Sequence, residues 1–290
     1  SVLATTPAGS SVYAATGCSH SIACGRVSYV LGLHGPCASY DAACAAALTA
    51  YHAGLRALQL DECLDGLAAG INVMLTPNNG TAFAISGLTS LAGRSHTFDV
   101  RADGYARAEA CCAAAMRQAH VALPSFSIFA LGNMVRQDGR SASLTAPNGQ
   151  AQQGLLASVL QDSRVAADAV TLNEAHGTGT ALGDPIETRA LVGAVIGPRA
   201  HGTDLPIGGV KANIGHAEPA AGLTGLLKLV VGLQDGRSPS NAQLRLLNPH
   251  VGGALHGVAG ALTVQLAALT MGSRGGVSSF GYSGTIAHAV

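Results

Sequence analysis

Residues 169–187 read AVTLNEAHGTGTALGDPIE, and this stretch decides the class of fold. Its apolar run, Ala169–Ala175, predicts a buried strand that ends at His176, and a loop of alternating Gly and Thr follows. The tetrapeptide Asp184-Pro185-Ile186-Glu187 then predicts a helix start, with an Asp N-cap, Pro at the first position and Glu three residues after the cap. We expect this helix to end at Gly197-Pro198. A strand, a glycine-rich turn and a helix in this order indicate an α/β fold with buried strands.

The same pattern recurs along the chain. We expect further strands at Pro36–Ala43, Leu64–Leu75, Leu205–Val210, Arg274–Phe280 and Thr285–Val290, and a helix at Ala217–Leu233. Leu64–Leu75 is apolar enough to predict a strand that is covered on both faces. After residue 44, a helix is predicted because one helical face gathers Leu48, Tyr51, His52, Leu55 and Leu58.

Composition excludes several classes of protein. The 290 residues carry 16 basic and 16 acidic side chains, so the formal net charge is zero, and charged residues are only 11% against 48% hydrophobic. Disorder is excluded, because it requires low hydrophobicity and high net charge. Nucleic-acid binding is disfavoured, because it requires a basic patch and the chain has no cluster of Lys and Arg. No apolar stretch reaches the ~18 residues of a membrane span. So little charge predicts extensive burial and a subunit or domain partner.

The seven cysteines lack C-x-x-C pairs, which disfavours both a disulfide framework and a zinc ribbon. Residues 1–10 have no basic segment followed by an apolar core, so no signal peptide is predicted. These features favour an intracellular, reducing compartment, either cytoplasm or plastid.

Cys44 is the first candidate for chemistry, in the stretch YDAACAAAL at residues 40–48. A strand that turns into an Ala-rich helix places this sulfur at a helix N-terminus. The free N–H groups there are expected to stabilise the thiolate and to lower its pKa. A buried, inert thiol is the alternative for any single cysteine.

Two histidines form the second group of candidates. The loop at His176 resembles a dinucleotide-binding loop, but its glycine spacing is one residue too long and no acidic residue follows at a second strand end. His216 lies at a loop-to-helix junction, which predicts a neutral imidazole that can donate its N–H. Lys211, five residues earlier, is by itself more often a solvated charge.

One nucleophile and two histidines at strand or loop ends predict acyl transfer, in which a thiolate carries the acyl group and two donors stabilise an oxyanion. Serine hydrolases and zincins are disfavoured because no G-x-S-x-G and no H-E-x-x-H occurs.

Four stretches in order give the chain a family resemblance. They are DAAC at 41–44, EAHGTGTALGDPIE at 174–187, GGVKANIGHAEPAAG at 208–222 and SSFGYSGTIAH at 278–288, supported by TFDVRADGYARAEA at 97–110 and QDGRSASLTAPNGQAQ at 137–152. The chain resembles β-ketoacyl synthases, in particular the ketosynthase domains of type I polyketide synthases. This implies a thiolase-like α/β fold with two similar halves in an αβαβα layering, here residues 1–130 with the nucleophile and 131–290 with both histidines.

The resemblance also implies roles for individual residues. Cys44 resembles the acyl-accepting nucleophile, His176 and His216 the pair that polarises the malonyl thioester carbonyl, and Lys211 the lysine that orients that site. Other implied roles are an oxyanion hole from the backbone N–H groups of Cys44 and Tyr282, contacts to the phosphopantetheine arm from Thr178, Thr180, Phe280 and Tyr282, and support of the histidine loop by Asp184 and Glu187. No metal and no directly bound cofactor are implied. The implied partners are an acyl carrier protein, or CoA thioesters as carriers, with acyl and malonyl thioesters, and a second copy in a homodimer.

The chain also departs from the family pattern. Three alanines replace the residues that usually follow the nucleophile, Ile286 replaces an Asn, and Tyr282 replaces the usual gating Phe. About the first third of the family domain, ahead of the nucleophile strand, has no counterpart, so we expect an N-terminally truncated fragment that is aggregated or inactive when expressed alone.

Two functions stay open at this point. The first is a condensing enzyme that performs decarboxylative Claisen chain extension in polyketide or fatty acid biosynthesis. The second is a non-elongating relative that acts as a scaffold or as an acyl-transfer and carrier-docking domain. The presence of Cys44 and His176 favours the enzyme.

Overall fold

The computed structural model describes residues 11–119, 128–199, 204–269 and 273–290. The helices are α1 (Ala14–Cys18), α2 (His20–Leu31), α3 (Ala46–Gln59), α4 (Pro77–Ile85), α5 (Gly149–Ser163), η3 (Ala167–Ala169), α6 (Gly183–Leu191), η4 (Val192–Ile196), α7 (Lys211–Ile214), η5 (Glu218–Ala220), α8 (Ala221–Asp235) and α9 (Pro249–Leu255). The strands are β1 (Asp65–Asn72), β2 (Ala110–Arg117), β3 (Asn133–Gln137), β4 (Val170–Glu174), β5 (Leu205–Gly208), β6 (Arg237–Ser238), β7 (Gly260–Leu262), β8 (Ala267–Ala268), β9 (Arg274–Phe280) and β10 (Thr285–Ala289).

A mixed six-stranded sheet forms the centre of the molecule, with the strand order β3-β10-β9-β4-β5-β7. Strand β4 runs parallel to both β5 and β9, and β5 runs parallel to β7. Strand β10 is antiparallel to β3 and to β9. The parallel strands end at the same edge of the sheet, where loops can bring polar side chains together.

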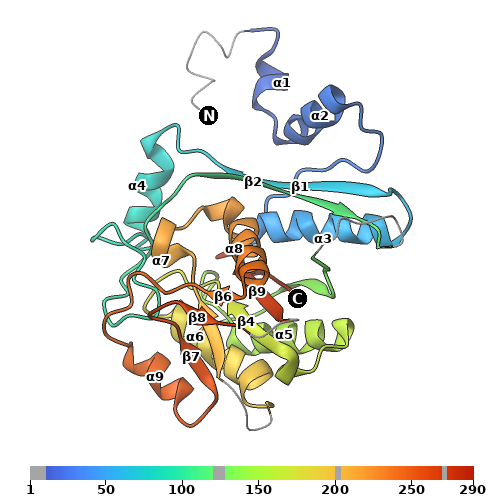
Figure 1. The fold of residues 1–290 in the computed structure, drawn as a ribbon. Coiled ribbons are helices and arrows are strands. Elements are labelled where there is room, and N and C mark those ends of the chain that lie inside the picture. Colours follow the sequence, from blue (N-terminus) through green and yellow to red (C-terminus); the bar gives the residue numbers. More distant parts are fainter. Residues whose placement is uncertain (1–10, 120–127, 200–203, 270–272) are drawn as a thin grey trace.

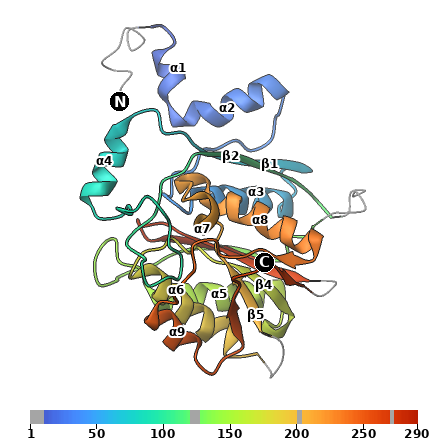
Figure 2. The same ribbon diagram turned by 60° about the vertical axis from the view of Figure 1, so that its left-hand side comes forward.

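Helices cover both faces of this sheet (Figure 1). Helix α5 contacts β3 and β10 on one face, where α6 packs against α5 and α9, and α8 contacts β4 and β9 on the other face. Helices α3 and α8 pack together and carry the two-stranded antiparallel ribbon β1–β2 on their far side. Figure 2 shows the same layers from a second direction, with α1 and α2 beyond the ribbon. The predicted α/β fold with stacked layers is confirmed.

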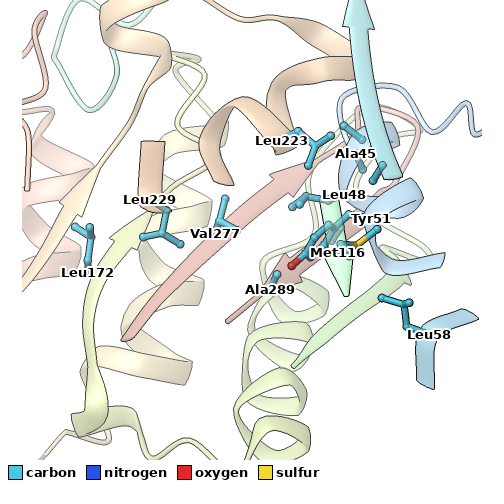
Figure 3. Close-up of a cluster of buried hydrophobic side chains, with 13 residues drawn as sticks. Ala45, Leu48, Tyr51, Leu58, Met116, Leu172, Leu223, Leu229, Val277 and Ala289 are labelled. Atoms are coloured by element: carbon cyan, nitrogen blue, oxygen red, sulfur yellow. The ribbon is translucent and has the colours of Figure 1, made fainter. Parts of the chain in front are cut away.

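One buried hydrophobic cluster lies between the sheet and the ribbon. It joins Leu48 and Tyr51 of α3, Leu223 and Leu229 of α8, and Met116 of β2 with Leu172 and Val277 of the sheet (Figure 3). A second cluster lies under α6 and α9 and includes Val170, Leu205 and Ile207. Ile286 belongs to a third cluster under α5, so this residue is a core side chain.

Most of the predicted elements are found close to their expected limits. The helical face after residue 44 is buried in α3 at Leu48, Tyr51 and Leu58. The strand expected at Ala169–Ala175 is β4, and the two closing strands are β9 and β10. Helix α6 continues into one π-helical turn, η4, and stops before Gly197-Pro198 as predicted.

Three predicted elements differ from the structure. Pro36–Ala43 forms no strand, because no strand of the described residues pairs with it, and only an isolated bridge joins Ala42 to Cys44. Leu64–Leu75 contains β1, but its side chains alternate between buried and exposed, so it is covered on one face only. The helix expected from Ala217 begins as the 3-10 turn η5, and α8 runs from Ala221 to Asp235.

No helix in the four described ranges is long and apolar enough to cross a membrane. The compartment therefore stays a prediction, as does the division into halves near residue 130.

Candidate active site

Cys44 lies in a tight turn immediately before α3. Ala43 has a φ of 48°, and the N–H groups of Ala45 and Ala46 donate to the carbonyls of Ala42 and Ala43 at 3.1 and 3.0 Å. The hydroxyl of Ser279 on β9 donates to the Cys44 carbonyl at 2.6 Å, which fixes this turn to the central sheet. The Cys44 sulfur is buried at this position.

The Cys44 side chain lies next to the side chains of both predicted histidines, His176 and His216. The Cys44 Sγ and a ring nitrogen of each histidine lie within 4.8 Å of one another, and all three side chains are buried. His176 follows β4, His216 follows α7, and their ring centroids are 5.5 Å apart with an interplanar angle of 86°. Three segments that are distant in sequence therefore converge at one edge of the sheet, as the sequence predicted.

The hydrogen bonds of His216 determine its tautomer. Its Nδ1 accepts the Glu218 N–H at 3.2 Å, so the neutral ring carries its proton on Nε2. That Nε2 lies 3.1 Å from the Cys44 Sγ, where its N–H can donate to the sulfur. Burial lowers the pKa of His216 well below its ordinary value, and the Lys211 ammonium lowers it further. A neutral donor is what the sequence predicted.

His176 is neutral for the same reasons. Burial lowers its pKa well below the ordinary value, and the neighbouring Lys211 and His216 add to the effect. Its ring lies 5.6 Å from that of Phe280, and its Nδ1 is buried without a partner among the described residues. The Nδ1 atom of His176 therefore remains available to form a hydrogen bond with a bound molecule.

Lys211 is buried, so the alternative of a solvated charge is wrong. Its ammonium donates to the backbone carbonyl of His176. Burial lowers the pKa of Lys211, while the carboxylates of Glu174 and Glu187 act in the opposite direction. Its position against the His176 backbone is suited to orienting that residue.

Asp184 is not the N-cap of α6, which begins one residue earlier at Gly183 and is preceded by Leu182. The Asp184 carboxylate instead accepts the N–H groups of Phe98 and Gly179 at 2.7 and 3.1 Å. The Glu187 carboxylate accepts the N–H groups of His176 and Gly177 at 2.6 and 2.8 Å. Both acids thus hold the loop of alternating Gly and Thr. Burial raises the pKa of Asp184 to about 6 and that of Glu187 to about 7.

The predicted lowering of the Cys44 pKa is wrong. Burial raises the pKa of this thiol to about 11, and the Lys211 ammonium and the N–H groups of Tyr282 and Cys44 only partly oppose that increase. The sulfur lies at a helix start, as expected, but its removal from water outweighs the helix dipole.

A cavity of about 350 Å³ opens onto these three side chains. Thr178, Thr180, Phe280 and Tyr282 line it together with Cys44, His176 and His216. The hydroxyls of Thr178 and Thr180 are 3.2 Å apart. Tyr282 is 44% exposed, and its ring lies edge-on to Phe83 of α4 with 6.2 Å between centroids. The cavity therefore collects every residue predicted to contact the substrate.

A thiolate and two imidazoles could also hold Zn²⁺. In the present hydrogen-bond arrangement, however, the His216 Nε2 carries a proton and offers no lone pair to a metal. The three side chains fit proton donation better than metal binding, and the absence of a metal stays a prediction.

Sequence reasoning missed several supporting residues. The Tyr105 ring packs edge-on against His216 at 4.7 Å, and Arg107 forms a two-pronged ion pair with Glu218, the residue that fixes the His216 tautomer. Ser279 anchors the Cys44 turn. Tyr105 and Arg107 lie in the supporting motif at 97–110, but no spacing rule connects that motif to His216.

Comparisons with known proteins agree with this geometry. The family model for the β-ketoacyl synthase N-terminal domain matches residues 2–122, and the model for the C-terminal domain matches residues 129–245. One of the phenolphthiocerol/phthiocerol polyketide synthase proteins of Mycobacterium tuberculosis is 41% identical over 288 residues, which are 96% of this chain and 13% of that protein. Erythronolide synthase EryA3 of Saccharopolyspora erythraea is 40% identical over 285 residues, 96% of this chain and 9% of that protein.

Solved structures give the same result. The oxazolomycin ketosynthase domain OzmH KS7 of Streptomyces albus JA3453 matches with a TM-score of 0.89 at 33% identity, over 93% of this chain and 49% of that one. The ketosynthase from module 6 of the bacillaene synthase of Bacillus subtilis 168 matches with a TM-score of 0.89 at 29% identity, over 96% and 51%. The predicted thiolase-like fold is confirmed. The chain spans about half the length of these ketosynthase structures and a small part of the curated synthases.

Proposed function

We propose a function from the premise that this chain belongs to the β-ketoacyl synthase family. The proposed activity is an acyltransferase reaction, the decarboxylative Claisen condensation of a malonyl-type extender with an acyl chain held on Cys44. The observation that carries it is the convergence of the Cys44 sulfur with two neutral, buried histidines in the lining of one cavity.

In the first step, the Cys44 sulfur attacks the carbonyl carbon of an acyl thioester. A new C–S bond forms to Cys44, the bond to the carrier sulfur breaks, and the Cys44 proton leaves with the carrier thiol. The His216 N–H and the N–H groups of Tyr282 and Cys44 lie around the sulfur and stabilise its negative charge.

In the second step, the histidines act on the extender. The bond between the malonyl carbon and its carboxylate breaks, CO₂ leaves, and the electron pair moves onto the thioester oxygen as an enolate. N–H donors from His176 and His216 bind that oxygen. Their lowered pKa values support this role, because neutral rings can donate hydrogen bonds without transferring a full proton to the enolate.

In the third step, the enolate carbon attacks the acyl carbonyl on Cys44. The N–H groups of Cys44 and Tyr282 bind the oxyanion of this tetrahedral intermediate. The C–S bond to Cys44 then breaks, and the product is a β-ketoacyl thioester that is two carbons longer than the acyl chain.

The partner in this proposal is an acyl carrier protein whose phosphopantetheine arm, or a CoA thioester in its place, enters the cavity past Thr178 and Thr180. Their hydroxyls lie 3.2 Å apart and line the same cavity as the two histidines, which supports this path. The proposal also includes a homodimer, in which residues 1–130 and 131–290 form the two halves of each protomer.

A non-elongating scaffold is not favoured, because the nucleophile and both histidines are present and in contact distance. The test is mass spectrometry after incubation of the chain with an acyl thioester and a malonyl carrier. Condensation gives a product longer by two carbons, whereas a Cys44-bound acyl group without elongation would contradict the proposed activity.

A further inference from the structure

A second pair of sulfurs lies away from the cavity, where α2 faces the segment that leads to Cys44. Cys24 and Ser28 are one helical turn apart on α2, and Cys37 and Ser39 lie on the facing segment. The Ser39 hydroxyl is 3.2 Å from the Cys24 sulfur, and the Ser28 hydroxyl is 3.4 Å from the Cys37 sulfur. These two matched contacts gather the side chains of Cys24 and Cys37 into one small cluster with Ser28 and Ser39.

A further contact holds α2 against the segment that carries Cys37 and Ser39. The Ser39 hydroxyl also lies 2.6 Å from the His20 carbonyl at the start of α2, where it can donate a hydrogen bond. Helix α2 has no buried residue of its own, so contacts with this segment are an important part of what holds it in place. A covalent link between Cys24 and Cys37 would therefore fasten α2 to the segment that ends at the nucleophile.

A disulfide at this pair requires Cys24 to be oxidised more readily than Cys44, and the pKa shifts of the two thiols have that direction. The Ser39 hydroxyl lowers the pKa of Cys24, Cys37 adds to that effect, and burial opposes it only in part. Burial instead raises the pKa of Cys44 to about 11. Because the thiolate is the reactive form, oxidants should attack Cys24 before they attack Cys44. Cys24 is also partly exposed and Cys37 is exposed, so a small oxidant can reach both.

We propose that Cys24 and Cys37 form a redox-active pair that hydrogen peroxide oxidises to a disulfide and that a small thiol reduces again. The Cys24 thiolate attacks the peroxide oxygen, the O–O bond breaks, and the leaving hydroxide takes up a proton as water. The Cys37 thiol then attacks the resulting sulfenic acid, the S–O bond breaks, and a second water leaves. The two sulfurs lose two electrons in total, and the peroxide gains them.

This site lies outside the condensing machinery and does not depend on it. Oxidation at the pair leaves the Cys44 thiol free, and it adds a covalent clamp between α2 and the segment that precedes the nucleophile turn. Reduction by a thiol such as glutathione restores both cysteines.

The test uses the full chain, reduced and then treated with hydrogen peroxide. Trypsin cuts after Arg26 and Arg56, so Cys24 and Cys37 lie on different peptides; Cys18 shares the peptide of Cys24, which fragmentation of the cross-linked peptide resolves, and Cys44 shares the peptide of Cys37. The experiment is therefore repeated in the Cys44→Ala variant. We expect the intact mass to fall by two hydrogen atoms, a Cys24–Cys37 cross-linked peptide to appear under non-reducing conditions, and dithiothreitol to reverse both changes.

Cys24→Ser and Cys37→Ser should each abolish the cross-link, while Cys63→Ser, at a partly buried cysteine outside the pair, should leave it unchanged. Circular dichroism of each variant checks that the chain remains folded. Sulfinic acid on Cys24 without a cross-link, or a cross-link between other cysteines, would overturn the proposal. Acylation of Cys44, measured on the reduced protein, tests the condensing activity separately.

Discussion

The Cys44 thiol has a pKa of about 11, so only a small part of it is thiolate at neutral pH. Burial disfavours the charged form, and the folded protein releases this proton only at high pH. The rate of Cys44 alkylation by iodoacetamide should therefore rise by about tenfold per pH unit from pH 7 toward pH 10. Peptide mass spectrometry measures this rate at Cys44 alone. A profile that is already flat above pH 8 would mean that the thiolate forms far more easily than its burial allows.

Removal of the sulfur should separate the two half-reactions. Cys44→Ala cannot form an acyl thioester, but both histidines and the cavity remain in place. We expect acylation to disappear and decarboxylation of a malonyl thioester to continue, because the enolate is stabilised by the histidines. Intact-protein mass spectrometry and CO₂ release measure the two activities. Equal acyl labelling of wild type and variant would assign the nucleophile to another residue.

Loss of either histidine should have the opposite effect. His176→Ala and His216→Ala each remove one donor to the enolate oxygen, which typically costs on the order of 10²–10³ in rate. Decarboxylation should fall by that factor, while Cys44 should still become acylated at least in part. Ser279→Ala, which alters only the anchoring of the Cys44 turn, serves as the control and should retain decarboxylation. Normal decarboxylation in both histidine variants would make their role structural.

At the scale of elements, one side chain defines the start of α5, the helix that covers β3 and β10. The Asn148 side chain accepts the N–H groups of Gln150 and Ala151 at 3.1 and 3.3 Å, and its own N–H donates to the Asp138 carbonyl at 2.8 Å. Asn148→Ala should lower the free energy of unfolding by about 1 kcal/mol, the usual cost of a lost N-cap. Urea denaturation measures it, and the exposed Gln150→Ala should change little. An unchanged urea midpoint in Asn148→Ala would contradict this role.

Local patterns predicted elements well where the cause of the structure is local. The apolar runs bounded by Gly correctly predicted β4, β9 and β10, and the helical face after Cys44 correctly predicted α3. The expected N-cap failed because the Asp184 carboxylate is bound to the N–H of Phe98, 86 residues away, a contact that no capping pattern reveals. Pro36–Ala43 failed as a strand because a strand is defined by its partner and not only by its own residues.

In the candidate site, too, the sequence predicted what has a local cause and missed what depends on distant segments. The motifs located Cys44, His176 and His216, and the alternation of strands and helices predicted that they meet at one edge of the sheet. The pKa of Cys44 could not be predicted from its helix position, because burial by distant segments determines it. The Glu218 N–H that sets the His216 tautomer comes from only two residues away, but the Glu218 carboxylate is held by Arg107, 111 residues earlier, and no local pattern reveals that contact.

For the molecule as a whole, the ribbon β1–β2 presents an apolar outer face. Leu67 and Ile71 are 47% and 57% exposed, and they pair with Ala115 and Cys111 on the same face. Within the described residues, β1 and β2 pair only with each other, so each strand has an open edge beside this face. Exposed apolar strands with open edges promote association, and only 11% of residues are charged.

We therefore expect the 290-residue chain to self-associate through this ribbon when it is expressed alone. A Leu67→Lys, Ile71→Lys double variant adds charge to the outer face without touching the core, and it should shift the chain toward smaller species. Leu144→Lys, at an exposed leucine outside the ribbon, is the matched control and should change little. Size-exclusion chromatography with light scattering, over a range of concentrations, measures the outcome. A wild-type chain that stays monomeric at every concentration, or a Leu144→Lys variant that dissociates equally well, would show that the ribbon does not drive association.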